Sequence, residues 1–173
     1  MECNLCPAGC GVDRSLGKLG RCGASGLKIA KYYLHPFEEP PISFSKGSGC
    51  IFFCGCSLRC VFCQNYELSH NKRGKDITVA ELADIFRELE ERGADNINLV
   101  TPTHYVDKIA EAFAIYRPKI PVVYNTHSYE NLETLKIADS FTAIYLPDLK
   151  FIDPLLSKRY TGREDYAKFA LPA

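Results

Sequence analysis

Three cysteines, Cys56, Cys60 and Cys63, follow directly on an apolar run that reaches Phe53. A continuous apolar run is typical of a parallel strand that is buried on both faces. The C-x3-C-x2-C spacing then places three thiolates in the loop after that strand, where they can hold three irons of a cubane cluster and leave the fourth iron open. An open coordination position is what a catalytic metal offers to a substrate. The feature predicts a metal centre at one end of a parallel sheet.

A zinc site is the alternative for this triplet. Tetrahedral zinc is commonly held by four thiolates, or by three thiolates and an imidazole, so Cys54 or a histidine would supply the fourth ligand. The histidines form no pair at the helical spacing of metal ligands, and each is expected to be a polar structural residue. They are His35, His70, His104 and His127. Cys50 and Cys54 lie within the apolar run and are expected to be small buried hydrophobes.

Nine cysteines in one chain need a common explanation. An odd number cannot pair completely in disulfides, and a reducing compartment disfavours them, so metal ligation is the better account. A second set lies in the glycine-rich segment 1–30, which we expect to be a small metal-stapled knuckle. Its members are Cys3, Cys6, Cys10 and Cys22. Four thiolates suit either a closed zinc site or a fully ligated iron–sulfur cluster.

The bulk composition fits one globular unit, because 46% of the residues are hydrophobic. The 21 basic and 21 acidic residues cancel, so composition gives no argument for nucleic acid or an anionic membrane as a partner. No apolar run approaches the roughly 20 residues that span a bilayer, and the first residues lack the pattern of a signal peptide. We therefore expect a cytoplasmic protein.

Strand and helix patterns alternate through 50–173, after a proline-containing connector at 31–49 that we expect to be an ordered loop. A capping box at Thr78 and Glu81 predicts the first helix, and Asp153-Pro154 predicts the start of the last. Apolar runs predict four strands, at 50–54, 96–100, 121–125 and 141–146. This alternation predicts an α/β fold with a parallel sheet of about four strands, wound as a barrel or part of one.

Ligands in such folds bind at the carboxyl ends of the strands. Each predicted strand ends in thiol or polar side chains that can face a ligand. After the cysteines of the first strand, these are Thr101, Thr103 and His104, then Asn125, Thr126 and His127, then Asp148 and Lys150. One end of the sheet is therefore predicted to hold the site.

The cysteine loop, with Gly-x-Gly-Cys-Ile-Phe-Phe before it and Cys-Gln-Asn at its end, resembles that of the radical S-adenosylmethionine (SAM) superfamily. The likeness is greatest to the branch related to pyruvate formate-lyase activating enzymes. It implies a 4Fe–4S cluster on Cys56, Cys60 and Cys63 whose open iron chelates SAM, and reductive cleavage of SAM to methionine and a 5′-deoxyadenosyl radical that abstracts hydrogen. It also implies a reductant such as flavodoxin or ferredoxin, and a protein substrate if the reaction is activation of a glycyl-radical enzyme.

The same resemblance implies contacts to SAM. Phe62 stands where an aromatic ring lies near the adenine, Asn65 stands near SAM, and Lys150, in an Asp-Leu-Lys segment, stands near the SAM carboxylate. The structural alternatives are packing of Phe62 under the loop, capping of the loop by Asn65 and a surface ion pair of Lys150. Asn125 is expected either to bond the ribose or to tie down its turn. No catalytic acid, base or nucleophile is assigned.

The chain departs from the family in two respects. Thr101-Pro102-Thr103-His104 replaces the Gly-Gly-Glu-Pro-like segment that meets the methionyl amino group, which leaves Thr101 as a candidate contact and Thr103 as the expected N-cap of the second helix. The family barrel usually has six strands, so we expect a C-terminally shortened partial barrel whose fourth strand exposes an edge. Another chain would cover that edge, unless the sequence is a fragment. A barrel too short to close around SAM favours an iron–sulfur electron carrier, and zinc at both cysteine sets would indicate a binding module.

Overall fold

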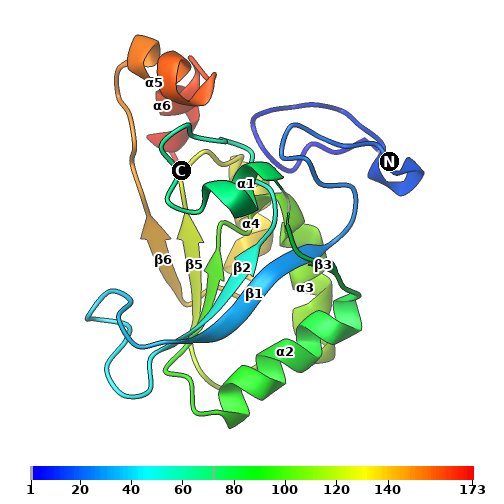
Figure 1. Ribbon diagram of the computed structural model, residues 1–173, viewed down its shortest axis with the longest axis vertical. Helices are drawn as coiled ribbons and strands as arrows, with labels where there is room; N and C mark the ends of the chain where they lie inside the picture. Colours follow the sequence, from blue (N-terminus) through cyan, green and yellow to red (C-terminus); the bar gives the residue numbers. More distant parts are fainter. Residues whose placement is uncertain (1, 72) are drawn as a thin grey trace.

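The computed structural model describes residues 2–71 and 73–173. Six strands form one mixed sheet in the order β3-β1-β2-β4-β5-β6 (Figure 1). Neighbouring strands from β2 to β6 pair in parallel: β2 (Ser48–Phe53), β4 (Ile97–Val100), β5 (Val122–Thr126) and β6 (Ile144–Pro147). On the other side of β2, β1 (Lys28–His35) pairs antiparallel with β2 and with the short β3 (Lys75–Asp76). Because β3 and β6 are its two edges, the sheet is open within the described residues.

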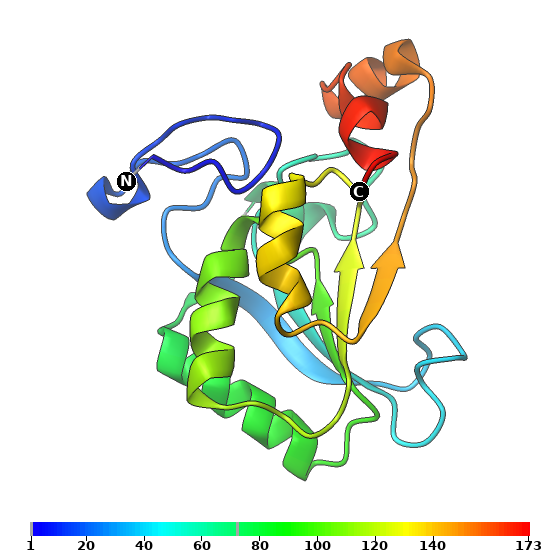
Figure 2. The same ribbon diagram turned by 180° about the vertical axis from the view of Figure 1, so that it is seen from behind.

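Three helices cover the back of the sheet, as Figure 2 shows: α2 (Val79–Glu91), α3 (Val106–Ile115) and α4 (Leu132–Asp139). α2 packs against α3, and α3 packs against α4. The capping box that starts α2 is confirmed, since Thr78 and Glu81 each accept the backbone N–H of the other. Gly93 follows α2 with φ of 82°, a left-handed conformation that costs glycine little.

The main core lies between these helices and the sheet. Ile51, Leu99 and Tyr124 are fully buried on the strands, and Phe86 stacks on Phe113 of α3 with ring centroids 4.4 Å apart. Burial of this apolar surface is the main force that holds the helices to the sheet. Since successive residues of a strand point to opposite faces, the residues between these core positions face the front, where the site lies.

The strand β1 corrects the expectation of a loop throughout 31–49. Tyr32 and Leu34 pack against the core, whereas Lys31, Tyr33 and His35 alternate with them on the front face. A register shift between Ile29 and Lys31 interrupts the period further. A strand with polar residues on one face and a bulge shows no apolar run, so the sequence pattern did not reveal it.

Three short helices lie at the carboxyl end of the parallel strands: α1 (Tyr66–Asn71), α5 (Pro154–Thr161) and α6 (Tyr166–Ala170) (Figure 1). The predicted start of α5 is confirmed, because the Asp153 side chain caps it, and Gly162 ends the helix with φ of 71°. The helix α6 was not predicted. Its Tyr166 packs with Cys56 and Leu58 in a second, smaller core. In the part of the chain that the structure describes, no helix has the length and apolar character to cross a bilayer.

The N-terminal segment contains little regular structure. A single bridge joins Glu2 to Asp13, and a short 3₁₀ helix, η1 (Arg14–Leu16), follows. The rest of the path as far as β1 consists of turns held by backbone hydrogen bonds, such as that from the Cys3 N–H to the Val12 carbonyl at 2.9 Å. Its buried residues Cys22, Ala24 and Leu27 belong to the main core, so the segment packs against the neighbouring elements.

Candidate functional site

A cavity of about 600 Å³ opens on the front of the sheet and includes the carboxyl ends of β2, β4 and β5. Its size lies within the range of roughly 300–1,000 Å³ that ligand pockets occupy. The three cysteines of the triplet and all five predicted cofactor contacts line it. These residues are Cys56, Cys60, Cys63, Phe62, Asn65, Thr101, Asn125 and Lys150. Residues that are far apart in the sequence thus share one site.

Burial governs the chemistry of the triplet. Cys56 and Cys60 are only 8% and 6% exposed, and Cys63 is half-buried. Burial, with a smaller contribution from nearby Cys60 and Cys63, raises the pKa of the Cys56 thiol to about 12. Burial also raises the pKa of Cys60, to about 11, against the opposing effect of the Lys150 ammonium. Thiols in this setting become thiolates when a cation compensates the charge, as a bound metal does.

The three thiols fit a cubane cluster as donors. Within 2–71 and 73–173, no three or more His, Cys, Asp or Glu side chains are arranged as ligands of a single metal ion. A cubane makes a different demand, because each thiolate binds its own iron. The triplet supplies three thiols from one loop, all open to the same cavity, with room beside them for a ligand of the fourth iron.

Left-handed backbone conformations mark the loops around the cavity. Arg59 has φ of 55°, Thr101 has φ of 56° and Ser128 has φ of 61°. These residues follow β2, β4 and β5 respectively, and such a conformation is a true outlier for the β-branched Thr101. Strained backbone of this kind is concentrated at functional sites. The sequence did not predict these left-handed conformations, since none of the three residues is glycine or asparagine.

Two buried histidines hold the cysteine loop from the neighbouring strands. His104 Nε2 lies 2.9 Å from the Cys54 carbonyl oxygen, and His127 Nε2 lies 3.1 Å from Ser57 Oγ. Burial lowers the pKa of His104 to about 4 and the pKa of His127 to about 3, so both rings are neutral near pH 7. A carbonyl can only accept, so the neutral His104 ring donates from Nε2. Both residues act structurally on the loop that carries the cysteines.

Thr103 is not the N-cap of α3, contrary to the expectation from sequence. It begins a 3₁₀ helix, η2 (Thr103–Tyr105), and its hydroxyl donates to Glu130 Oε1 at 2.6 Å. Thr126 donates to the same oxygen, so Glu130 joins the loops after β4 and β5. Burial raises the pKa of Glu130 to about 7. Glu130 was not predicted from the sequence, because its burial and its two threonine partners are visible only in the folded structure.

The predicted SAM contacts differ in their surroundings. Lys150 is paired with Asp148 while it lines the cavity, and its backbone N–H donates to the Tyr166 hydroxyl at 2.9 Å. Phe62 makes edge contacts with Phe151 and Tyr160 and is still 53% exposed, so it packs on its neighbours and also presents surface to the cavity. Through its hydrogen bond to the Lys150 N–H, Tyr166 of α6 fixes the backbone that carries Lys150.

The backbone carbonyls of Asn65 and Asn125, two further predicted contacts to SAM, accept backbone N–H groups. The carbonyl of Asn65 accepts the N–H of Ser69 at 2.9 Å, at the start of α1. The carbonyl of Asn125 accepts the Thr101 N–H at 2.8 Å. Both asparagines line the cavity as well. The turns are therefore fixed through the main chain.

The N-terminal cysteines lie close to one another. Burial, with smaller contributions from Cys22, Cys3 and Cys10, raises the pKa of Cys6 to about 12. A Cβ added to Gly20 would lie 3.1 Å from Cys10 Sγ and 3.6 Å from Cys22 Sγ. All nine cysteines of the chain are free of disulfides.

Arg14 connects this second cysteine set to the end of β4. Its guanidinium donates to the His104 carbonyl oxygen at 2.6 Å and to Cys22 Sγ at 3.3 Å. His104 in turn holds the Cys54 carbonyl, next to the triplet. The N-terminal segment is therefore joined to the loop that lines the cavity.

The α/β sheet with a cysteine loop at its carboxyl end belongs to a known class of protein. The sequence profile of the Radical SAM superfamily matches residues 50–170, and the chain belongs to this superfamily. Its members are generally enzymes that bind a 4Fe–4S cluster and SAM. The chain is also 29% identical over 174 residues to "Uncharacterized protein MJ0674" of Methanocaldococcus jannaschii, with 95% of this chain and 50% of that protein covered. It thus spans half the length of this relative. No solved structure matches the chain.

Proposed function

We propose that Cys56, Cys60 and Cys63 hold a 4Fe–4S cluster and that SAM binds in the cavity in front of it. When bound, such a cluster supplies the electron that cleaves SAM into methionine and a 5′-deoxyadenosyl radical, which abstracts a hydrogen atom from the substrate. The observation that carries this proposal is the single cavity shared by the triplet and the predicted contacts from β4, β5 and the segment after β6.

The residues of the chain would position SAM. The Lys150 ammonium lies close enough to Cys60 to lower its pKa, so a carboxylate bound beside the triplet would meet this charge. Asp148 holds Lys150 in place. Asn125 offers an amide to the ribose, and Phe62 offers an exposed ring to the adenine.

The segment after β4 would meet the amino group. Thr101 lines the cavity and carries the hydroxyl and carbonyl oxygens that can accept from an ammonium. Its left-handed conformation, with φ of 56°, turns the chain sharply at this point. A neutral oxygen in place of the glutamate usual in the family predicts a weaker hold on this part of SAM.

The proposed reaction also requires partners. Electron delivery requires a reductant such as flavodoxin or ferredoxin, in a reducing cytoplasm that keeps the thiols free. Activation of a glycyl-radical enzyme is the reaction that the resemblance to pyruvate formate-lyase activating enzymes suggests. We also propose a second metal centre at the N-terminal cysteines, either an iron–sulfur cluster, in which each thiolate binds its own iron, or zinc, for which the four thiols would have to draw together around one ion. The mutual effect of these cysteines on the pKa of Cys6 supports the proposal.

One anaerobic experiment tests the proposal. The full chain is reconstituted with iron and sulfide, and the electron paramagnetic resonance (EPR) spectrum of the reduced protein is recorded with and without SAM. We expect SAM to change the signal and to yield 5′-deoxyadenosine. Cys63→Ala should abolish both results, while Cys54→Ala, a buried cysteine outside the triplet, should retain them. A cluster that SAM does not affect would instead indicate an electron carrier, and colourless protein with zinc at both sites would exclude the cluster.

A further inference from the structure

The cavity continues from the triplet along the front of the sheet. Its far wall is formed by Lys31, Tyr33 and His35 of β1 and by Phe52 of β2. Three residues at alternate positions of a strand share one face, so these β1 side chains point to the same side. Lys31 pairs with Phe52 of β2, and the same cross-strand row continues through β4 to Asn125 of β5. This wall therefore begins in the same cross-strand row as a residue that we assign to SAM.

A lysine held on two aromatic rings is the main feature of the wall. The rings of Tyr33 and Phe52 are stacked with centroids 5.7 Å apart and an interplanar angle of 2°. Lys31 Nζ lies 5.1 Å from the Tyr33 centroid and 4.7 Å from that of Phe52. Cation–π attraction holds the ammonium there. It makes no ion pair with any carboxylate in the described part of the chain, so its charge is available to a ligand.

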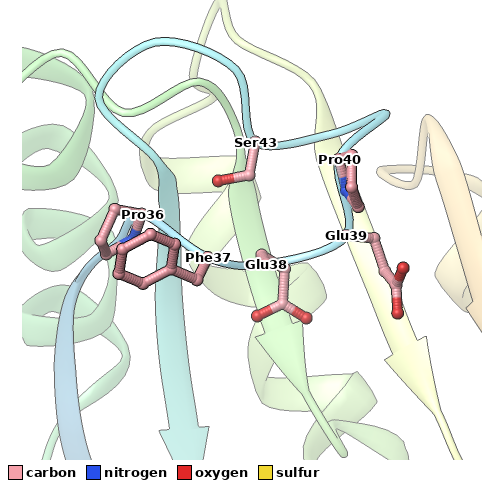
Figure 3. A pocket seen from close by; sticks show the side chains of 6 residues that line it. All are labelled: Pro36, Phe37, Glu38, Glu39, Pro40 and Ser43. Atoms are coloured by element: carbon pink, nitrogen blue, oxygen red, sulfur yellow. The ribbon is translucent and has the colours of Figure 1, made fainter.

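Two carboxylates stand at the other end, on the loop 36–47. Figure 3 shows the side chains of Glu38 and Glu39 extending from this loop in the direction in which the neighbouring strands point, and both line the cavity. Glu38 is engaged, because Cys50 Sγ donates to it at 3.6 Å and His35 Nε2 lies 3.9 Å away. The backbone carbonyl of Glu39 accepts the N–H groups of Ile42 and Ser43, whereas its carboxylate makes no ion pair or hydrogen bond with another residue that the structure describes. The wall thus offers one uncompensated charge of each sign.

The loop that carries the carboxylates is fixed to the fold. Asp95 accepts the backbone N–H groups of Phe44, Ser45 and Gly47 at 2.9 to 3.0 Å. Together these bonds anchor the returning half of the loop to the turn between α2 and β4. The Glu39 carbonyl also accepts the N–H groups of Ile42 and Ser43, so the backbone that carries the Glu39 side chain is held within this loop, as a binding site requires.

A buried amide without partners, Asn98, lies in the same cross-strand row as Tyr33, behind the residues that line the cavity. Asn98 is 0% exposed, and neither its amide nitrogen nor its oxygen has a hydrogen-bond partner within the described residues. Its neighbours Ile97 and Leu99 face the core, so Asn98 faces the front, in register with Cys50. Buried polar groups are almost always paired in native structures. A polar ligand or a water at this place would supply the missing partners.

We infer that this half of the cavity is the substrate site, and that it takes a compound with a carboxylate and an amine separated by many bonds, namely a short peptide or an amino acid with a side-chain amine. The carboxylate binds Lys31, the amine turns to Glu39, and the carbon skeleton lies on Tyr33 and Phe52. Lys31 and His35 are about 13 Å apart along the strand, and Glu39 lies on the loop beyond His35, so the two charges of the substrate must be well separated. In the reaction, a substrate C–H bond breaks and its hydrogen atom joins the 5′ carbon of the radical, which leaves the unpaired electron on the substrate. The inference rests on the proposed function, because the other half of the cavity supplies that radical.

Isotope transfer tests the substrate class. The reconstituted chain is incubated with SAM, dithionite and a mixture of uniformly deuterated amino acids and short peptides, and mass spectrometry measures deuterium in 5′-deoxyadenosine. Deuterium should appear with this mixture and be absent with deuterated hexanoate or hexylamine, each of which lacks one charge. Unlabelled 5′-deoxyadenosine with the mixture would overturn the substrate assignment and leave SAM cleavage standing. Absence of any 5′-deoxyadenosine would contradict the proposed function itself.

Charge-removing variants test the two residues. Lys31→Met and Glu39→Gln should each lower the labelled fraction of 5′-deoxyadenosine at subsaturating amino acid by about tenfold, which corresponds to about 1.4 kcal/mol of binding. Lys136→Met and Glu133→Gln are the matched controls, because these residues pair with each other on the exposed side of α4. Circular dichroism checks that all four variants fold. An unchanged labelled fraction in Lys31→Met and Glu39→Gln would overturn the assignment.

Discussion

The backbone N–H of Cys56 donates a hydrogen bond to the carbonyl oxygen of Cys22 at 3.3 Å. This contact joins the first residue of the triplet to the last cysteine of the N-terminal set. Arg14 reinforces it by donating to Cys22 Sγ. The N-terminal segment is therefore part of the framework that positions the cysteine loop.

Gly55, next to this contact, should tolerate no side chain. It has φ of 85°, and an added Cβ would lie 2.4 Å from the Cys22 carbonyl oxygen. We expect Gly55→Ala to lower the free energy of unfolding by roughly 1–3 kcal/mol or more, from strain and displacement of Cys22. Urea unfolding of the purified chain measures it. Gly26→Ala is the control, because nothing lies within 4 Å of its added Cβ. Equal stability of the two variants would refute the close approach.

Arg14 should contribute to stability through its bond to His104. Arg14→Met removes a charged donor from the carbonyl oxygen, so we expect the free energy of unfolding to fall by about 1.5–3 kcal/mol. Arg92→Met removes an exposed pair with Glu88 on α2 and should cost less than about 0.5 kcal/mol. Urea unfolding of both variants provides the comparison. A loss no larger than that of Arg92→Met would show that Arg14 is not a structural link.

Glu130 should make stability depend on pH. The folded carboxyl keeps its proton up to about pH 7, whereas the unfolded one releases it near 4.5, so folding takes up a proton in between and stability falls as pH rises through this window. Glu130→Gln retains an acceptor for Thr103 without the charge. We expect it to raise the free energy of unfolding at pH 8 by up to about 3 kcal/mol relative to its effect at pH 5. Urea unfolding at both pH values measures this difference, and Glu133→Gln, on exposed α4, should show none.

Asp95 should hold the loop that carries Glu39. Its carboxylate accepts three backbone N–H groups, whose hydrogen bonds lower its pKa well below the usual range despite opposing desolvation. We expect Asp95→Ala to speed hydrogen exchange at Phe44, Ser45 and Gly47 by about tenfold or more, because each N–H loses its acceptor. Mass spectrometry of peptic fragments, or nuclear magnetic resonance, measures it. Asp84→Ala, in an exposed pair on α2, should leave these amides unchanged, and slow exchange in both variants would contradict the anchoring role.

Much of the fold could be predicted from local signals. Helix caps at Thr78 and Asp153 and the apolar strands β2, β4 and β5 were evident, because each depends on neighbouring residues. The strand β1 and the helix α6 were missed. The front face of β1 is polar because it faces the cavity, and α6 is a short helix whose packing against Cys56 and Leu58 is a long-range contact.

The site, like the fold, was predicted in part. Residue types at strand ends predicted the triplet, Asn125 and Lys150, since ligands gather at that end of a parallel sheet. His104 and His127 were expected to be structural, but their lowered pKa values and the raised pKa of Glu130 could not be predicted, because these shifts depend on burial. The wall of Lys31, Tyr33 and Phe52 was also missed, as it arises from pairing between two strands.

The sequence alone therefore determined the superfamily and the three cysteines, because their spacing is local and the chemistry of a three-thiolate loop depends on few other residues. The tertiary structure decided what faces that loop. Strand pairing placed Lys31 and Phe52 in the same cross-strand row as Asn125. Folding also brought the Cys22 carbonyl to the Cys56 N–H. Contacts between distant segments, the burial that shifts pKa values and the shape of a cavity are properties of the packed chain, and local sequence patterns do not encode them individually.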